Sequence, residues 1–230
     1  MLSQKQLDIA FFYSYYGLMS SFQKTQQQLA KETQKYNNLL NAGYQLFIEQ
    51  GVDAVSIQEI AERAGVAKGT FYLYFKDKDD LREQIITQKS NQLFQRALSA
   101  LHQTNISKFE DQVVFVIDYV VDVLAHNREA LKLIDKNLSL GIFNHKMNEF
   151  LSSSDTDIIR ALSIAAERCG IALKNPRILL YMIIELASST CFSCILYSEP
   201  LELTVFKPYL FSAIRQLIRS QIVSRINLDT

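Results

Sequence analysis

The amino-acid sequence contains very few residues that interrupt helices. Three prolines and seven glycines are spread over 230 residues, and from residue 37 onward the apolar residues recur at helical spacing nearly throughout. A β-sandwich needs a turn about every 8 to 12 residues, which so few breakers do not supply. No segment is predicted as a strand. We therefore predict an all-α fold with a large core, because 48% of the residues are hydrophobic.

Charge and cysteine content exclude several classes of protein. Lysine plus arginine equal aspartate plus glutamate at 24 each, so any DNA binding must be local. The three cysteines, Cys169, Cys191 and Cys194, lie in apolar helical patterns, which is poor material for a disulfide framework or a metal site. We interpret them as buried small side chains in a reducing, cytoplasmic protein. No cofactor is expected.

Two apolar stretches resemble targeting or membrane segments. Ile9 to Met19 has no small-residue cleavage site after it, so we do not interpret it as a signal peptide. Ile178 to Tyr197 has the length of a membrane span but contains Glu185, and a charge near the bilayer centre costs about 2.5 to 3.5 kcal/mol. We expect this segment to be buried within the protein or an interface, with no membrane partner.

The pattern predicts four helices between about residue 37 and His102. The first ends at Gly51, and Ser56 with Glu59 forms a capping box that starts a short second helix. Lys68 to Phe75 is a third short helix, and Asp77 caps a long fourth one. Further helices are predicted at Phe109 to Leu124, Arg128 to Asn137, Leu138 to Leu151, Asp157 to Cys169, Pro176 to Ser198 and Thr204 to Ile226.

We divide the chain into an N-terminal extension (1–30), a helix-turn-helix domain (31–78) and a larger helical domain (79–230). Two interpretations of the extension stay open. Ile9 to Tyr16 forms an extra helix that packs on the body or on a partner, or Met19 is the natural start of the protein.

The segment from Ser56 to Phe75 has the order helix, glycine turn, helix. Small residues at Ala61 and Ala64 let a second helix cross the first closely, and Gly65 permits the left-handed backbone of a tight turn. We expect Phe71 and Phe75 to point inward, which turns polar residues outward. Residues 37–76 hold three basic and four acidic side chains, but four basic residues face one acidic residue between 63 and 78. Positive charge is therefore concentrated on the segment that would read DNA.

The runs SIQEIAERAG (56–65) and AGVAKGTFYLYFKDKDDL (64–81), after a helix ending LFIEQG (46–51), resemble the DNA-binding domain of the TetR family of one-component transcriptional regulators. The resemblance covers roughly residues 37–81; the rest agrees in helix number and length. It implies that phosphates are contacted by Ser56, Thr70, Tyr72, Tyr74 and Lys78. It also implies that base edges are approached by Lys68, Gly69 and Thr70. Taken singly, the tyrosines also fit half-buried aromatics and the lysines a solvated face.

By the same resemblance, the larger domain dimerises and binds a small molecule. The expected dimer interface lies on the last two helices and includes Tyr181, Leu186, Phe192, Leu196, Leu210 and Ile214, although these residues also fit a simple core. Candidate effector-pocket residues are polar or adaptable groups within apolar stripes: Tyr119, His126, Phe143, Met147, Tyr181 and Glu185. Their surroundings favour a hydrophobic or amphiphilic effector.

The sequence therefore predicts a homodimeric regulator that binds double-stranded DNA, with a repressor released from a palindromic operator by a small molecule as the expected form. An enzyme is not expected, because the sequence has no phosphate loop, no G-x-S-x-G and no H-E-x-x-H motif. A helical adaptor that binds protein and not DNA is the alternative. Substitution of Lys68 and Tyr72 separates the two.

Overall fold

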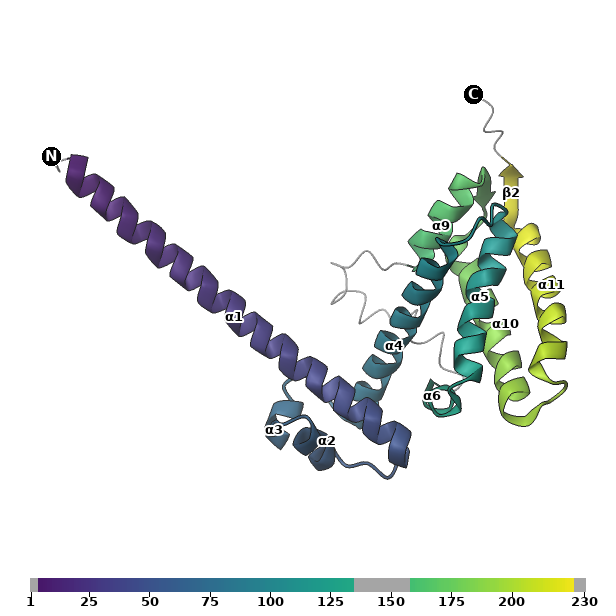
Figure 1. Cartoon of the computed structure of the whole chain (residues 1–230), viewed down its shortest axis with the longest axis horizontal. Helices are drawn as coiled ribbons and strands as arrows, with labels where there is room; N and C mark the ends of the chain where they lie inside the picture. The colour runs from purple at the N-terminus through teal and green to yellow at the C-terminus, as the bar shows by residue number, and fades with distance from the viewer. Residues whose placement is uncertain (1–3, 135–157, 226–230) are drawn as a thin grey trace.

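The computed structural model describes residues 4–134 and 158–225, and it is predominantly helical (Figure 1). The predicted helix at Leu138 to Leu151 lies outside the described residues. The elements are α1 (Gln4–Gln50), α2 (Ile57–Arg63), α3 (Lys68–Phe71), α4 (Lys78–Leu101), α5 (Phe109–Ala125), α6 (Arg128–Ile134), α9 (Ile158–Arg168), β1 (Ile171–Leu173), α10 (Pro176–Tyr197), α11 (Leu203–Gln221) and β2 (Ile222–Arg225).

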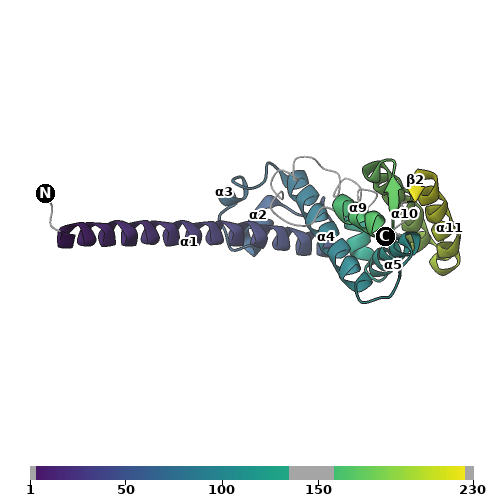
Figure 2. The same ribbon diagram turned by 90° about the horizontal axis from the view of Figure 1, so that it is seen from above.

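Helix α1 is much longer than the sequence pattern predicts. It is one helix of 47 residues, and Figures 1 and 2 show it extending well past α2 and α3. The apolar stripe that indicates a helix in a core begins only where α1 meets its neighbours, at Leu39 and Leu40. The preceding stretch from Gln26 to Lys35 is rich in Gln, Lys, Ala and Glu, which propagate a helix without packing. Residues 4–30 are therefore not separated from the first helix by a break.

Two clusters of buried side chains form the cores. The N-terminal cluster joins α1, α2 and the segment after α2, with Leu39, Ile60 and Phe71 fully buried in it. The C-terminal cluster joins α4, α5, α9, α10 and α11. Helix α4 belongs to both, because Leu81 and Ile85 pack into the first cluster and the rest of its buried face into the second. A change in the position of α4 therefore affects both cores.

Helix α10 lies at the centre of the C-terminal body. By length and composition it could cross a membrane, but eight of its residues are buried and it packs against α5, α9 and α11. Asn175 caps its N-terminus and Ser198 ends it with a left-handed backbone, φ 56°. This burial explains the apolar composition of the segment.

A small antiparallel sheet corrects the expectation that the chain has no strand. β1 pairs with β2, with Ala172 opposite Ser224 and Leu173 opposite Ile222. The last helix consequently ends at Gln221 and not at residue 226. Its apolar period continues through Ile222, but the backbone there pairs with β1 and Lys174 N–H donates to the Gln221 carbonyl at 2.8 Å. Pairing across the fold overrides the local helical pattern.

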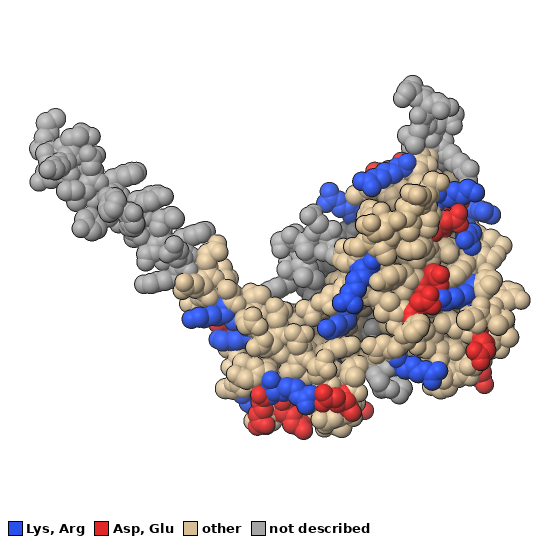
Figure 3. Space-filling model, in the orientation of Figure 1, with Lys and Arg blue, Asp and Glu red and all other residues tan. Residues whose placement is uncertain are grey.

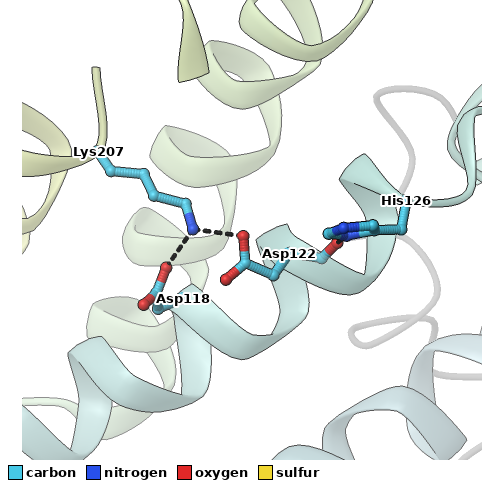
Figure 4. Close-up of polar contacts among 4 residues, drawn as sticks. All are labelled: Asp118, Asp122, His126 and Lys207. Carbon is cyan, nitrogen blue, oxygen red and sulfur yellow. Dashed lines mark hydrogen bonds and ion pairs between the residues drawn. The ribbon is translucent and has the colours of Figure 1, made fainter. Parts of the chain in front are cut away.

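Ion pairs fasten α11 to α5. The Lys207 ammonium lies 2.6 Å from an Asp118 carboxylate oxygen and also bonds to Asp122, one turn further along α5 (Figure 4). Burial acts to lower the pKa of Lys207, but its hydrogen bonds to the two carboxylates outweigh burial, so the pKa is raised. Arg215 bonds to Asp111 at 3.0 Å further along the same helices. The contact fixes the position of α11 on the body.

Candidate nucleic-acid interface

The start of α2 and the turn after it have the predicted geometry. The Ser56 hydroxyl accepts a hydrogen bond from Glu59 N–H at 3.2 Å, and the Glu59 carboxylate accepts one from Ser56 N–H at 2.8 Å. Ser56 also donates its hydroxyl hydrogen to Glu59 at 2.7 Å. Gly65 has φ +70°, a conformation that costs a residue with a Cβ about 1 kcal/mol or more. The capping box and the glycine together set the angle at which the chain enters α3.

Buried aromatic rings fix α3 against the domain. Phe71 and Phe75 are 0% and 2% exposed, and their ring centroids are 5.4 Å apart. The α-helix is shorter than predicted, because it ends at Phe71 and residues 72–74 form turns. The exposed side is made by Lys68, Gly69 and Tyr72, with Thr70 half-buried beside them. Leu73 is 77% exposed, which the sequence pattern does not indicate.

Tyr74 is turned back towards α1. Its hydroxyl donates to the Glu32 carboxylate, and its side chain is half-buried. Next to it, the ring of Tyr36 stacks on Phe75 with centroids 5.4 Å apart and an interplanar angle of 18°. Glu32 carried no signal in the sequence, because it lies 42 residues from Tyr74 and ahead of the expected first helix.

Two of the other predicted phosphate-contacting residues are also engaged within the protein. The Lys78 ammonium donates to the carbonyl oxygens of Asp53 and Val55, at 3.2 and 2.9 Å, so it anchors the loop before α2. The Ser56 hydroxyl is committed to the capping box. Both groups lie at the helix ends that border Lys68 to Phe75, which we call the reading segment. Their contact with DNA stays a prediction.

The charges around the segment are mixed. Figure 3 shows acidic and basic side chains side by side over the α2 region. Arg63 forms an ion pair with Glu49 at 2.7 Å, whereas Lys68 and Lys76 are exposed. The positive charge available to a polyanion is therefore local to α3 and the turn that follows it.

The C-terminal core contains a small apolar cavity. Its volume is about 30 Å³, room for roughly one water-sized group. Ser188 and Cys191 are its only polar-atom side chains; the full lining is Phe94, Ile117, Val120, Val121, Leu124, Leu131, Ile184, Ala187, Ser188, Cys191, Phe192 and Ile195. Burial raises the pKa of the Cys191 thiol to about 12, so the thiol stays protonated.

The predicted effector-pocket residues that are described lie outside this lining. Tyr119 and Glu185 are half-buried, Tyr181 is exposed, and His126 is exposed at the end of α5 with Nδ1 2.7 Å from the Asp122 carbonyl oxygen. Phe143 and Met147 lie outside the described residues. Within the described part of the chain, no group of three or more His, Cys, Asp or Glu side chains could hold a metal ion.

The predicted interface residues divide into two groups. Tyr181 is 47% exposed, and Leu186, Phe192 and Leu196 are half-buried on α10. Leu210 and Ile214 are 2% and 0% exposed, so placing these two on a partner-facing surface is wrong. The same apolar stripe of α11 packs against α5 and α10 of its own chain. The large hydrophobic side chains that are exposed on α10 and α11 are instead Ile178, Tyr181, Tyr197, Val205 and Tyr209.

A capped helix, a glycine turn and a short outward-facing helix, joined by α4 to a separate helical core, define a helix-turn-helix regulator with a second, helical domain. Comparison with known proteins gives the family. The family model described as "Bacterial regulatory proteins, tetR family" matches residues 39–85, and the Transposon Tn10 TetC protein of Escherichia coli is 30% identical over 154 residues, 60% of this chain and 77% of that protein. The chain belongs to the TetR family of bacterial transcriptional regulators, which are DNA-binding proteins and not enzymes.

Other relatives and solved structures agree with this assignment. The "Fatty acid metabolism regulator protein" of Bacillus subtilis is 32% identical over 122 residues, 51% of this chain and 60% of that protein, so the match spans less than two thirds of that relative. The structure of FadR from Bacillus halodurans has a TM-score of 0.53 at 20% identity, covering 78% of this chain and 94% of that one. FadR from Bacillus subtilis in complex with stearoyl-CoA also has a TM-score of 0.53 at 20% identity, covering 80% and 99%. These likenesses confirm the all-α fold.

Proposed function

We propose that the protein is a cytoplasmic, homodimeric repressor that leaves a palindromic operator when a hydrophobic or amphiphilic small molecule binds. The observation that carries the proposal is the geometry after Gly65. Phe71 and Phe75 anchor the segment inside, which leaves Lys68 exposed on a short, fixed helix and Tyr72 exposed directly after it. A lysine in such a position reaches base edges, whereas a tyrosine beside it reaches phosphate.

The division into domains is part of the proposal. Residues 31–78 hold most of the N-terminal cluster, and residues 79–230 hold the C-terminal one. A single reading helix contacts only a few base pairs, so a two-fold dimer is needed for a specific site. Val205 and Tyr209, exposed on α11, supply an apolar surface for that dimer, and Tyr181 is exposed on α10. Figures 1 and 2 both place α11 at the outer edge of the body.

We further propose a long-chain acyl compound as the effector. The fatty acid metabolism regulator among the relatives, and the FadR structure with stearoyl-CoA, support this class. The apolar cavity supports it in chemistry but not in size, because about 30 Å³ does not hold an acyl chain. Binding must therefore displace the cavity walls, and Phe94 of α4 is one of them. Tyr119 on α5 and Glu185 on α10 are half-buried, and each is next in sequence to a residue that lines the cavity. They stay candidates for contacts with a polar head.

DNA binding is tested by fluorescence anisotropy with duplexes from the region that flanks the coding sequence. We expect Lys68→Ala to weaken binding about five-fold or more, since a good base contact contributes about 1–3 kcal/mol. Tyr72→Ala should also weaken binding, through the loss of a phosphate contact. Lys108→Ala, which removes an exposed lysine at the start of α5, is the matched control and should change affinity less than two-fold. Absence of duplex binding by the folded wild type would favour the protein-binding adaptor, whereas unchanged binding by the first two variants would show that another surface contacts DNA.

Dimerisation and effector release need separate measurements. Tyr209→Asp should yield a monomer in sedimentation experiments, whereas Ile164→Asp, at a partly exposed apolar residue of α9, should leave the dimer intact. Stearoyl-CoA should release DNA and free coenzyme A should not. If neither compound releases the DNA, the proposed acyl effector is wrong, but the proposal that the protein binds DNA is unaffected.

A further inference from the structure

Tyr74 faces an acidic residue where a DNA-binding surface is expected to offer hydrogen-bond donors. Its hydroxyl donates to the carboxylate of Glu32 on α1. The same carboxylate accepts a hydrogen bond from the Lys35 ammonium at 3.0 Å, one turn along α1. Glu32 therefore holds two neighbouring groups, Tyr74 and Lys35, that could otherwise bind a phosphate.

The protonation states make this contact exclusive. Burial, followed by the hydrogen bond to Glu32, raises the pKa of Tyr74 to about 12, and the hydrogen bonds from Tyr74 and Lys35 lower the pKa of Glu32. At neutral pH the tyrosine is a neutral donor and the glutamate an ionised acceptor. A phenol has one hydrogen to donate, and a phosphate oxygen can only accept. Tyr74 cannot donate to Glu32 and to a phosphate at the same time.

The surrounding side chains hold the pair in place. The side chain of Tyr36 on α1 packs against the reading segment. Its ring stacks on Phe75, and its ring centroid lies 6.1 Å from that of Tyr74. Its hydroxyl donates to Gln84 of α4 at 2.8 Å. α1 therefore forms a fixed flank of the reading segment, and Glu32 and Tyr36, four residues apart, project from one face of it.

We infer that Glu32 is a positioning residue that withholds the Tyr74 hydroxyl from DNA phosphates and thereby limits the affinity for any duplex. This inference rests on the proposed reading of DNA by the segment after Gly65. It assigns Tyr74 a role different from the phosphate contact that the family resemblance implies. Glu32 also places a negative charge beside the expected path of the DNA backbone, which weakens binding further.

A double-mutant cycle tests the inference. Dissociation constants for a specific and a random duplex are measured at several salt concentrations with the wild type, Glu32→Ala, Tyr74→Phe and the double variant. We expect Glu32→Ala to bind both duplexes about five-fold more tightly, because a like charge is removed and the hydroxyl is freed. Tyr74→Phe should change binding less than two-fold in the wild type but weaken it about three-fold in the Glu32→Ala protein, because only the part of the gain that comes from the hydroxyl is lost.

Matched variants separate this competition from general charge and from loss of structure. Glu49→Gln removes another partly exposed, ion-paired carboxylate of α1 and should not reproduce the gain. Glu32→Gln removes the charge while keeping an acceptor, so it covers the case in which the alanine variant unfolds. Thermal unfolding checks that each variant is folded.

Each outcome decides the question. Equal losses from Tyr74→Phe in both backgrounds would mean that Tyr74 already contacts phosphate, which overturns the inference. A gain in Glu32→Ala that persists in full after Tyr74→Phe would assign the whole effect to Lys35 or to net charge, which also overturns it. Failure of the wild type to bind any duplex would instead remove the proposed function, and the inference with it.

Discussion

Replacing Lys207 by methionine tests how strongly α11 is fastened to the body. The Lys207 side chain is 15% exposed and holds two carboxylates, whereas Asp118 and Asp122 are 40% and 51% exposed. The half-exposed carboxylates regain water when the cation is removed, so the loss is smaller than the roughly 3–5 kcal/mol of a broken buried pair. Two partly screened pairs give about 1–2 kcal/mol. For a chain of this size, that corresponds to a fall in Tm of about 2–8 °C.

The comparison is made with Arg219→Met on the same helix. Arg219 is 64% exposed and its Nε lies 3.8 Å from Glu110, so its loss should cost less than about 0.5 kcal/mol. Urea unfolding at one fixed protein concentration gives the two free-energy differences, because the proposed dimer would make stability depend on concentration. Equal losses from the two variants would refute the argument from burial and geometry.

The pH dependence gives an independent check of the Lys207 contact. Its pKa is raised in the folded protein, so its contribution is complete below the unfolded value of 10.5 and is lost as pH rises through the folded value. The difference in unfolding free energy between the wild type and Lys207→Met should therefore be constant from pH 7 to pH 9 and shrink only in more alkaline solution. A decline already at neutral pH would contradict the assignment.

Two further predictions concern buried chemistry and backbone conformation. At pH 8, a thiol reagent should react with Cys191 about 1,000-fold more slowly in the folded protein than in the unfolded chain, because burial raises the thiol pKa from 9.0 to about 12. The measurement uses a Cys169→Ala, Cys194→Ala protein, in which Cys191 is the remaining thiol. Rapid labelling of this protein while it is still folded would contradict the prediction. Gly65→Ala should lower the unfolding free energy by about 1 kcal/mol, since Gly65 has φ +70°. Gly69→Ala, inside α3 with open space around the added Cβ, should be neutral or raise it by up to about 1 kcal/mol, and a loss as large as that of Gly65→Ala would show that the turn geometry is not the cause.

Local features of the reading segment could be predicted because each depends on residues close in sequence. The capping box needs only Ser56 and Glu59, and the turn needs only a glycine at position 65. Inward placement of Phe71 and Phe75 follows from their spacing of one helical turn. None of these features depends on the position of another helix.

Features that depend on distant parts of the chain could not be predicted. An apolar stripe on α11 shows which side of the helix is buried, but not whether its own core or a partner covers Leu210 and Ile214. The strands escaped prediction because three or four residues carry too little alternation, and only the pairing of Ala172 with Ser224 defines them. The Glu32 contact depends on α1 continuing as a helix through a stretch with no buried face.

The continuity of α4 is what would let an event in the C-terminal core reach the reading segment. Phe94 lines the cavity and Leu81 packs in the N-terminal cluster, 13 residues earlier on the same helix, or about 20 Å away. If an effector displaces Phe94, a tilt of about 5° in a rigid helix of this length moves its other end by about 2 Å. In a dimer the two displacements add, to about the rise of one base pair, which is enough to take two reading segments out of register with half-sites one helical turn apart. A small cavity in the free protein is therefore compatible with regulation, because the required change is the displacement of α4 and not the filling of a preformed pocket.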